Sequence, residues 1–430
     1  MKLQGWGRYP IVEAPECLDE NLERATRKAV LSRGLGRSYG DASLPVGGAA
    51  AGSRLADRIL DFDPSSGRLH AEAGLSLRTL SWTFWPRGWS SPVLPGTAYL
   101  TLGGMVAADV HGKEHHVHGT FGAHVEALRM RLADGSVLWT DRAREPELFR
   151  ATLGGMGLTG HVLEVVVALV PIPTPWIVQE TERFPDLKSF LGGLERAAAD
   201  WPFTVGWIDC LKAGRSMGRG ILYRGRWASR DEAPAAPPSP RRRLAVPFDA
   251  PSAALNRWSV AGFNEVLYRK HGAGVRRVIA HPEDFFHPLD KVRHWNRGYG
   301  RRGFTQYQCV VPSREGAARV LSDLVAAGAA SFLCVLKDCG LEGEGMLSFP
   351  RPGTSIAVDL PIRDETRALV DRLNARVIDE GGRVYLAKDT FTRSADYRAM
   401  DSRVDDFLAV RRRVDPLSRL QSMLSRRLEL

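Results

Sequence analysis

Glycine is concentrated in four short segments between residues 32 and 160, and no other feature restricts the possible folds of this chain as strongly. The segments are "SRGLGRSYGDAS" at 32–43, "LPGTAYLTLGGMVAADVHG" at 94–112, "HGTFGAHVE" at 118–126 and "ATLGGMGLTG" at 151–160. Glycine permits positive φ and lets a ligand reach bare backbone N–H groups, and successive N–H groups attract anions. One such segment is typical of a surface turn. Four of them, separated by short strands, predict a long phosphate-bearing cofactor laid across strand ends.

The spacing of the glycines argues against two common nucleotide sites. The chain has no GxGxxG in the strand-to-helix setting of a dinucleotide fold and no GxxxxGK[ST] loop, which disfavours NAD and P-loop nucleotides as the resident ligand. Four histidines, His111, His115, His116 and His118, lie at the end of the second segment and between it and the start of the third. A zinc site needs fixed ligand spacing and further protein ligands. We therefore expect these histidines to pack or to contact the cofactor, and we predict no metal site.

The composition is that of a globular enzyme, with 44% hydrophobic and 25% charged residues among 430. The net charge of +10 suits anionic lipid, phosphorylated small molecules or nucleic acid. No known nucleic-acid-binding motif is present, so nucleic acid is disfavoured. The five cysteines are scattered and contain no CxxC, which indicates reduced thiols. The N-terminus lacks a signal sequence and no apolar run is long enough to span a membrane. We expect a cytoplasmic protein, or one peripheral at the inner membrane.

The order of strand-like and helix-like segments predicts a mixed α+β chain. Residues 28–170 alternate short β-like runs with glycine turns, including a hairpin at Asp134–Gly135. Further strands are predicted in "FTQYQCVVP", "FLCVLKDCG" and "TSIAVDLPI". Helical periodicity over 313–328 and 363–382 ends in glycine each time. Residues 231–243, "DEAPAAPPSPRRR", have too few apolar side chains to pack, so we expect a mobile loop or lid at about 229–250.

Several longer motifs are collinear with those of a known family. They are "RGLGRSYGDA", "ELFRATLGGMGLTG", "FFHPLD", "QYQ", "LSFPRPG", "AVDLPI" and "VYLAKD". Together they resemble the oxidase subunits of decaprenylphosphoryl-ribose 2-epimerases, which belong to the FAD-dependent vanillyl-alcohol-oxidase superfamily. The resemblance implies a two-part FAD-binding domain of the vanillyl-alcohol-oxidase (PCMH) type, formed by residues 1–175 and 384–430. It also implies an inserted α+β substrate domain at 176–383, built on an antiparallel sheet.

The resemblance implies which residues bind the cofactor. In the first loop they are Arg33, Gly34, Leu35, Gly36, Arg37, Ser38, Tyr39, Gly40 and Asp41. The later segments supply Gly96, Thr101, Gly103, Gly104, His111, Gly112, Lys113, Val162 and Tyr385. Physically, the glycines expose N–H groups to the pyrophosphate, and Arg37 can add positive charge. Arg37 also stands where covalent flavoenzymes of the superfamily have a histidine, which implies that FAD is bound non-covalently.

The resemblance implies substrate and catalytic residues as well. Tyr299, Gln306, Gln308, Lys337, Ala357 and Lys388 match positions of the substrate pocket, and Lys388 and Tyr385 match catalytic positions. Two glutamines two residues apart face the same side of a strand and can present both amides to sugar hydroxyls. Residues three apart point to opposite faces of a strand, so Tyr385 and Lys388 share a site only if the chain bends after Tyr385. Ala357 replaces a cysteine of the mycobacterial members.

The implied activity is FAD-dependent oxidation of the 2-hydroxyl of a polyprenylphosphoryl ribose to the 2-keto sugar. This is the first half of an epimerisation to the arabinose form, a precursor of cell-wall arabinan. A separate NAD(P)H-dependent short-chain reductase completes it, and peripheral membrane contact is expected because the substrate is lipid-linked. Two alternatives stay open at this point. One is an FAD-dependent oxidase or dehydrogenase of another sugar, alditol or aldonolactone, and the other is a non-catalytic basic protein that binds lipid or nucleic acid.

Overall fold

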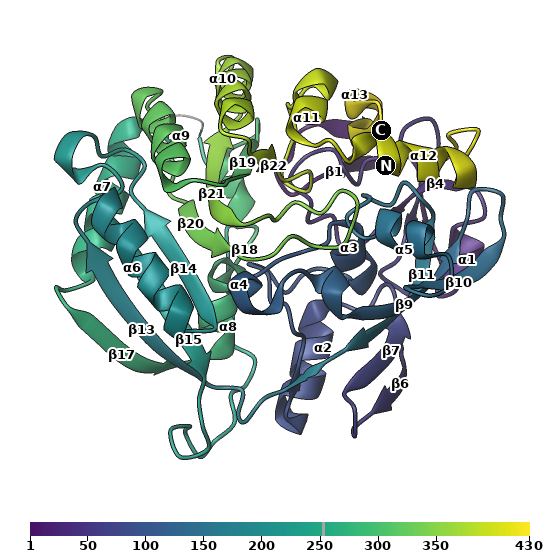
Figure 1. Ribbon diagram of the computed structural model, residues 1–430, viewed down its shortest axis with the longest axis horizontal. Coiled ribbons are helices and arrows are strands. Elements are labelled where there is room, and N and C mark those ends of the chain that lie inside the picture. Colours follow the sequence, from purple (N-terminus) through teal and green to yellow (C-terminus); the bar gives the residue numbers. More distant parts are fainter. Residues whose placement is uncertain (252–253) are drawn as a thin grey trace.

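Two large sheets dominate the computed structural model, which describes residues 1–251 and 254–430 (Figure 1). The N-terminal sheet has five antiparallel strands in the order β10-β9-β11-β7-β6. Their bounds are β6 Ile59–Asp63, β7 Arg68–Glu72, β9 Val125–Arg131, β10 Val137–Asp141 and β11 His161–Ala168. The predicted hairpin joins β9 to β10, and Gly135 has the positive φ of +96° that this turn requires.

Smaller elements complete the N-terminal half. A three-stranded parallel sheet has the order β3-β5-β4, with β3 Glu16–Leu18, β4 Ala29–Arg33 and β5 Ala49–Gly52. Two strand pairs are β1 Lys2–Gln4 with β2 Ile11–Glu13, and β8 Trp89–Ser90 with β12 Val170–Pro171. The helices are α1 Leu22–Ala25, α2 Leu77–Phe84, α3 Leu102–Ala107, α4 His115–His118 and α5 Pro146–Thr152. The first predicted glycine loop follows β4, in which Leu31 is the buried residue.

The second sheet has eight strands, and every neighbouring pair in it is antiparallel. Its order is β17 Val275–Ala280, β13 Ile177–Phe184, β15 Gly220–Trp227, β14 Phe203–Ile208, β20 Cys334–Cys339, β21 Gly353–Pro361, β19 Phe304–Val311 and β22 Arg383–Val384. All eight residues of β19 are buried, as expected for a strand covered on both faces. The antiparallel sheet and the mixed α+β fold expected from the sequence are thus confirmed.

Helices cover the eight-stranded sheet. α6 Leu187–Asp200 packs on β14 and β15, α9 Arg314–Ala326 packs on β21 and β19, and α10 Thr366–Asp379 packs on β19 and β22 (Figure 1). The two helices predicted by periodicity are α9 and α10, and each is followed by a glycine with positive φ, Gly328 and Gly381. The remaining elements of this half are α7 Arg257–Lys270, α8 Pro282–Phe286 and the parallel pair β16 Leu244–Ala245 with β18 Val292–Arg293.

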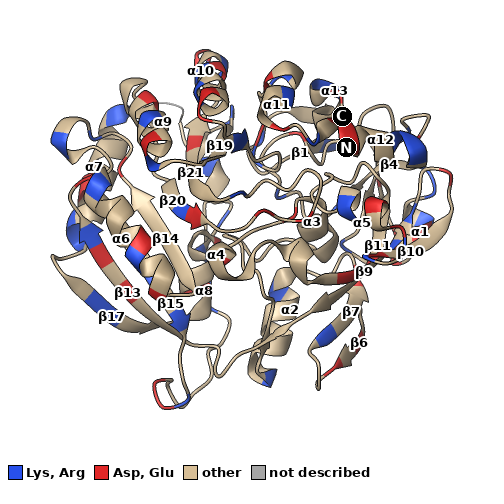
Figure 2. Ribbon diagram, viewed as in Figure 1, with Lys and Arg blue, Asp and Glu red and all other residues tan. Residues whose placement is uncertain are grey.

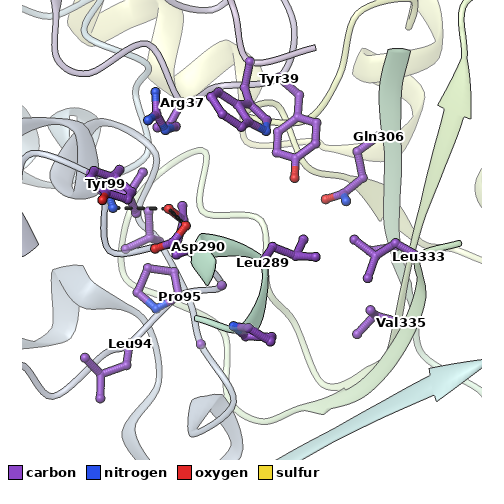
Figure 3. Close-up of a pocket in the computed structure, with 18 of the residues that line it drawn as sticks. Arg37, Tyr39, Leu94, Pro95, Tyr99, Leu289, Asp290, Gln306, Leu333 and Val335 are labelled. Atoms are coloured by element: carbon purple, nitrogen blue, oxygen red, sulfur yellow. Dashed lines mark hydrogen bonds between the residues drawn. The ribbon is translucent and has the colours of Figure 1, made fainter. Parts of the chain in front are cut away.

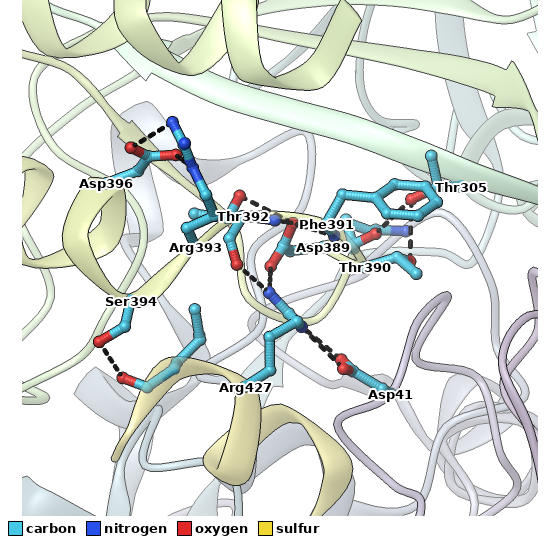
Figure 4. A network of polar contacts seen from close by, with 12 residues as sticks. Asp41, Thr305, Asp389, Thr390, Phe391, Thr392, Arg393, Ser394, Asp396 and Arg427 are labelled. Atoms are coloured by element: carbon cyan, nitrogen blue, oxygen red, sulfur yellow. Dashed lines mark hydrogen bonds and ion pairs between the residues drawn. The ribbon is translucent and has the colours of Figure 1, made fainter. Parts of the chain in front are cut away.

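The C-terminal segment packs back on the N-terminal half. It contains α11 Ser394–Met400, α12 Val404–Val414 and α13 Met423–Leu428. Figure 4 shows Arg427 of α13 between two carboxylates, and its guanidinium donates to Asp41 at 2.9 Å and to Asp389 at 2.7 Å. All three side chains are largely buried. This ion network connects the first glycine loop to the end of the chain. The domain limits expected at residues 175 and 384 stay predictions.

The proline-rich segment at 229–250 lies largely on the surface, but several contacts hold it. Arg226 donates to Glu232 at 2.7 and 2.6 Å, Trp176 Nε1 donates to the carbonyl of Ala236 at 3.2 Å, and Arg243 donates to Glu283 at 3.0 Å. These contacts fix the segment at both ends and near its middle. Its mobility stays a prediction.

Candidate active site

A cavity of about 1520 Å³ lies between the glycine segments and one face of the eight-stranded sheet. In Figure 3, Arg37, Pro95 and Tyr99 lie on the wall opposite Leu333 and Val335. Most of the residues predicted from the sequence line it. On the glycine side they are Gly34, Leu35, Gly36, Arg37, Ser38, Tyr39, Gly96, Thr101, Gly103, Gly104, His111, Gly112, Lys113 and Val162. On the sheet side they are Tyr299, Gln306, Gln308, Lys337, Ala357, Tyr385 and Lys388.

The first glycine loop presents a row of bare amides to the cavity. The backbone N–H groups of residues 34–38 donate to no acceptor among the described residues, although all five residues line the cavity wall. Gly36 has φ +62°, and a Cβ added to Gly34 would stand 2.4 Å from Thr101 Oγ1. Successive unpaired N–H groups in such a turn are an anion-binding cradle. The loop therefore fits the pyrophosphate of FAD.

Arg37 adds a positive charge to the same end of the cavity, where the nearest acidic influence is the Asp290 carboxylate. Its guanidinium lies 4.2 Å from the ring centroid of Trp6 and donates to the carbonyl of Leu35 at 2.9 Å, but it forms no ion pair with any described residue. Burial lowers its pKa, although an arginine stays charged at neutral pH. A partly buried cation without a carboxylate partner suits a phosphate ligand. No histidine occupies this position in the loop, in agreement with non-covalent FAD.

Three residues of the predicted cofactor loop do not line the cavity. Arg33 donates to Ser43 Oγ at 2.8 Å and to the carbonyl of Gln4 at 2.7 Å. Asp41 binds Arg427, and a Cβ on Gly40 would stand 1.9 Å from the carbonyl oxygen of Asp389. The side chains of Arg33 and Asp41 and the close approach at Gly40 hold the loop in shape. We expect these three to act on the cofactor only through the loop they support.

The sheet side of the cavity carries a buried polar group that sequence analysis missed. In the antiparallel register Gln306 lies opposite Asp359 and Gln308 opposite Ala357. Gln306 Nε2 donates to Asp359 at 2.6 Å, and the Tyr299 hydroxyl donates to the other oxygen at 2.9 Å. Burial raises the pKa of Asp359 to about 6, although both hydrogen bonds favour the charged form. Sequence analysis could have found Asp359, because it is the one charged residue within the apolar strand β21.

Lys388 lies on the cavity wall close to Asp359, because the chain bends after β22. The N–H of Lys388 donates to the carbonyl of Tyr385 at 3.0 Å, which closes the turn required to bring both side chains to one site. Lys388 Nζ stands 3.8 Å from the ring centroid of Tyr39. Burial lowers the pKa of Lys388 to about 8, against the opposing attraction of the Asp359 carboxylate. The side chain is thus cationic at neutral pH and close to losing its proton.

A second polar group lines the cavity around His111. Lys337 Nζ contacts His111 Nδ1 and donates to the carbonyl of Gly112 at 2.7 Å. On the other side of the ring, Gln308 Nε2 lies 3.3 Å from His111 Nε2. Burial and the Lys337 charge hold the pKa of His111 well below its usual range, so the imidazole is neutral. No group of three His, Cys, Asp or Glu side chains in the described ranges is arranged to hold a metal ion.

Tyr385 is fixed at the wall rather than free to move. Its hydroxyl donates to the carbonyl of Ala108 at 3.0 Å, and its ring stacks on Phe349 with centroids 4.8 Å apart. Burial raises its pKa, so the phenol stays protonated at neutral pH. Tyr385 therefore offers an immobile aromatic face beside His111, suited to positioning a flat ring.

Comparison with known proteins identifies the cofactor and the family. Residues 20–141 match the model of an FAD binding domain. Decaprenylphosphoryl-beta-D-ribose oxidase of Mycolicibacterium smegmatis is 34% identical over 453 aligned positions, which cover all of this chain and 97% of that protein. An uncharacterised protein of Streptomyces coelicolor is also 34% identical, over 83% of this chain.

More distant oxidases match only part of the chain. L-Gulonolactone oxidase of Mus musculus is 27% identical over 174 positions, or 40% of this chain. A match over this part of the chain supports FAD chemistry but does not indicate which substrate this chain oxidises. The full-length match agrees with the cavity, in which the glycine segments face polar side chains of the eight-stranded sheet. This chain is an FAD-dependent oxidoreductase and belongs to the decaprenylphosphoryl-beta-D-ribose oxidase family.

Proposed function

We propose that this protein oxidises the 2-hydroxyl of a polyprenylphosphoryl ribose to the 2-keto sugar. The observation that carries the proposal is one continuous cavity that joins the bare amides of the first glycine loop to the polar group of Gln306, Asp359 and Lys388. Its volume of about 1520 Å³ exceeds the roughly 300–1000 Å³ typical of a site for one ligand. A flavin cofactor and a glycolipid head can therefore share it.

Some residues of the cavity would bind the sugar, and others would stabilise the charge that develops during the reaction. The first glycine loop and Arg37 would hold FAD, which would supply a hydride acceptor for the sugar carbon. Gln306 and Gln308 present their amides to the sugar hydroxyls from one face of β19. The Lys388 ammonium would hold the hydroxyl oxygen on the carbon that is oxidised and stabilise the negative charge that develops on this oxygen as its proton leaves. Asp359, ionised above about pH 6, keeps that ammonium charged and is the carboxylate on the sheet wall that can accept the proton.

The lipid part of the substrate and a partner enzyme follow from the same proposal. Leu289, Leu333 and Val335 give the cavity an apolar side for the first part of a polyprenyl chain (Figure 3). The 2-keto product would be reduced by a separate NAD(P)H-dependent short-chain reductase, giving the arabinose form for cell-wall arabinan. No helix in the described part of the chain could cross a bilayer. We propose peripheral contact with the inner membrane, supported by the net charge of +10.

A substrate panel tests the proposal. The purified protein is mixed anaerobically with a polyprenylphosphoryl ribose, the matching arabinose compound, free ribose, an alditol and an aldonolactone, and the visible flavin absorbance is followed. We expect rapid bleaching with the polyprenylphosphoryl ribose and none with the alditol or lactone. Bleaching by the lactone alone would show that the chain oxidises another sugar class, and a protein without flavin would overturn the enzymatic reading.

A further inference from the structure

The helix α7 at the mouth of the cavity carries apolar side chains on its outer face. Within Arg257–Lys270 only Val260 and Asn264 are buried. Trp258 is 83% exposed and Val266 is 70% exposed. A tryptophan this exposed, close to another exposed apolar side chain, commonly marks an interaction surface. The helix thus has an outer face without a partner in this structure.

The exposed apolar residues form a row that leads to the cavity. Trp258, Gly262, Val266 and Lys270 are spaced by four positions, so they form a row that winds about 40° around the helix at each step, with Trp258 and Val266 as its apolar members. Lys270 lies at the C-terminal end of the row and is itself part of the cavity lining. Phe263, one step around the helix, is 47% exposed and also lines the cavity. The apolar row and the cavity therefore open on the same side of α7.

Cations without partners surround this opening. Lys270, Arg276 of β17 and Arg293 of β18 are exposed, line the cavity and form no ion pair with the described residues. Figure 2 shows basic residues on β17, the edge strand of the eight-stranded sheet. Neighbouring arginines on the same elements are paired with carboxylates, Arg269 with Glu265 at 2.6 Å and Arg277 with Glu232 at 2.9 Å. Three cations without an ion pair among the described residues thus lie at the cavity mouth, where the row on α7 ends.

We propose that α7 and the cavity mouth dock on the surface of an anionic lipid bilayer. Trp258 and Val266 would insert at the boundary between headgroups and chains, while Lys270, Arg276 and Arg293 would lie against the headgroup phosphates. An exposed apolar row next to unpaired cations is the pattern of helices that lie in a membrane interface. This inference rests on the proposed function, because it gives a lipid-linked sugar a path from the bilayer into the cavity without crossing water.

Vesicle binding of the full-length flavoprotein tests the docking surface. Sedimentation with vesicles of equal parts phosphatidylglycerol and phosphatidylcholine is compared with vesicles of phosphatidylcholine alone, for wild type and for Trp258→Ser/Val266→Ser. The control is Leu341→Ser/Leu417→Ser, whose side chains have the same exposures of 83% and 70%. We expect the α7 variant to lose at least about tenfold in affinity for the anionic vesicles and the control to bind as wild type. Each of Lys270→Gln, Arg276→Gln and Arg293→Gln should lose about fivefold.

A water-soluble substrate separates failure of docking from failure of the proposed function. Neither Trp258 nor Val266 lines the cavity, so Trp258→Ser/Val266→Ser should oxidise a short-chain polyprenylphosphoryl ribose in solution at the wild-type rate and lose rate only on vesicle-borne substrate. Equal vesicle binding by wild type and the α7 variant would overturn the inference. So would equal binding to neutral and anionic vesicles, or a protein dimer that the α7 variant dissociates while vesicle binding persists. Failure of wild type on the soluble substrate would instead overturn the proposed function.

Discussion

Removing the positive charge at Lys388 should slow flavin reduction by about a hundred- to a thousandfold without loss of FAD. The size follows from the position of the side chain, since one preorganised charge in a water-poor site typically contributes about 3–4 kcal/mol to the transition state. Lys388→Met removes the charge and keeps the length of the chain. FAD should stay bound because the amides of residues 34–38 do not bond to Lys388, whose ammonium contacts only the ring of the neighbouring Tyr39 in this loop.

The pH dependence gives the same prediction a second readout. Burial lowers the pKa of Lys388 to about 8, so at pH 7 about nine in ten molecules carry the charge. The rate constant of flavin reduction should therefore fall about tenfold per pH unit above pH 8, as the ammonium loses its proton. Lys388→Arg keeps a charge at every accessible pH and should lose this alkaline decline, whatever its absolute rate.

Anaerobic stopped-flow reduction measures both effects, with the FAD occupancy determined on the same samples. Lys388→Met should be slow and should show no alkaline decline near pH 8. A variant that reduces at the wild-type rate would refute the role of the charge. An alkaline decline that persists in Lys388→Met would assign the titration to another group.

Three further predictions follow from single contacts. Arg427→Met leaves the buried carboxylates of Asp41 and Asp389 without their cation. It should lower the free energy of unfolding, measured by urea denaturation, by about 3–5 kcal/mol. A loss below about 1 kcal/mol would contradict the role given to the network. Ala357→Cys should keep FAD and turnover and add a thiol to the cavity wall. An electrophile that binds the substrate site should modify this thiol, which mass spectrometry detects. Absence of modification would show that residue 357 is not accessible from the cavity. Acid precipitation should release all flavin into the supernatant, because Arg37 cannot form a histidyl–flavin bond, and flavin retained in the pellet would contradict this.

Local patterns in the sequence predicted the sheet side of the site well. Gln306 and Gln308 were expected on one face because side chains alternate along a strand, and both line the cavity. The bend after Tyr385 was required for Lys388 to reach the same site, and the turn is present. These features depend on residues close together in the chain. The family resemblance assigned these residues to the site, and short-range geometry added the shared face of the glutamines and the need for a bend.

The features that sequence analysis missed depend on pairings distant along the chain. Asp359 becomes part of the site only because the register of β19 with β21 places it opposite Gln306. The family resemblance assigned Asp41 to the cofactor as part of the first loop, but its partner is Arg427, 386 positions away. A motif match identifies a loop as a whole and does not say which of its side chains face the ligand. Only the tertiary structure separates the residues that line the cavity from those that hold the loop.

The central claim is that the bond broken in the reaction with flavin is the C–H bond at carbon 2 of the sugar. A polyprenylphosphoryl ribose carrying deuterium at that carbon tests it most directly, in single-turnover flavin reduction beside the unlabelled compound and a compound labelled at carbon 3. The account predicts that deuterium at carbon 2 slows bleaching several-fold while deuterium at carbon 3 has no effect. Equal rates for all three compounds in a reaction limited by chemistry, or slowing by the carbon 3 label alone, would contradict it.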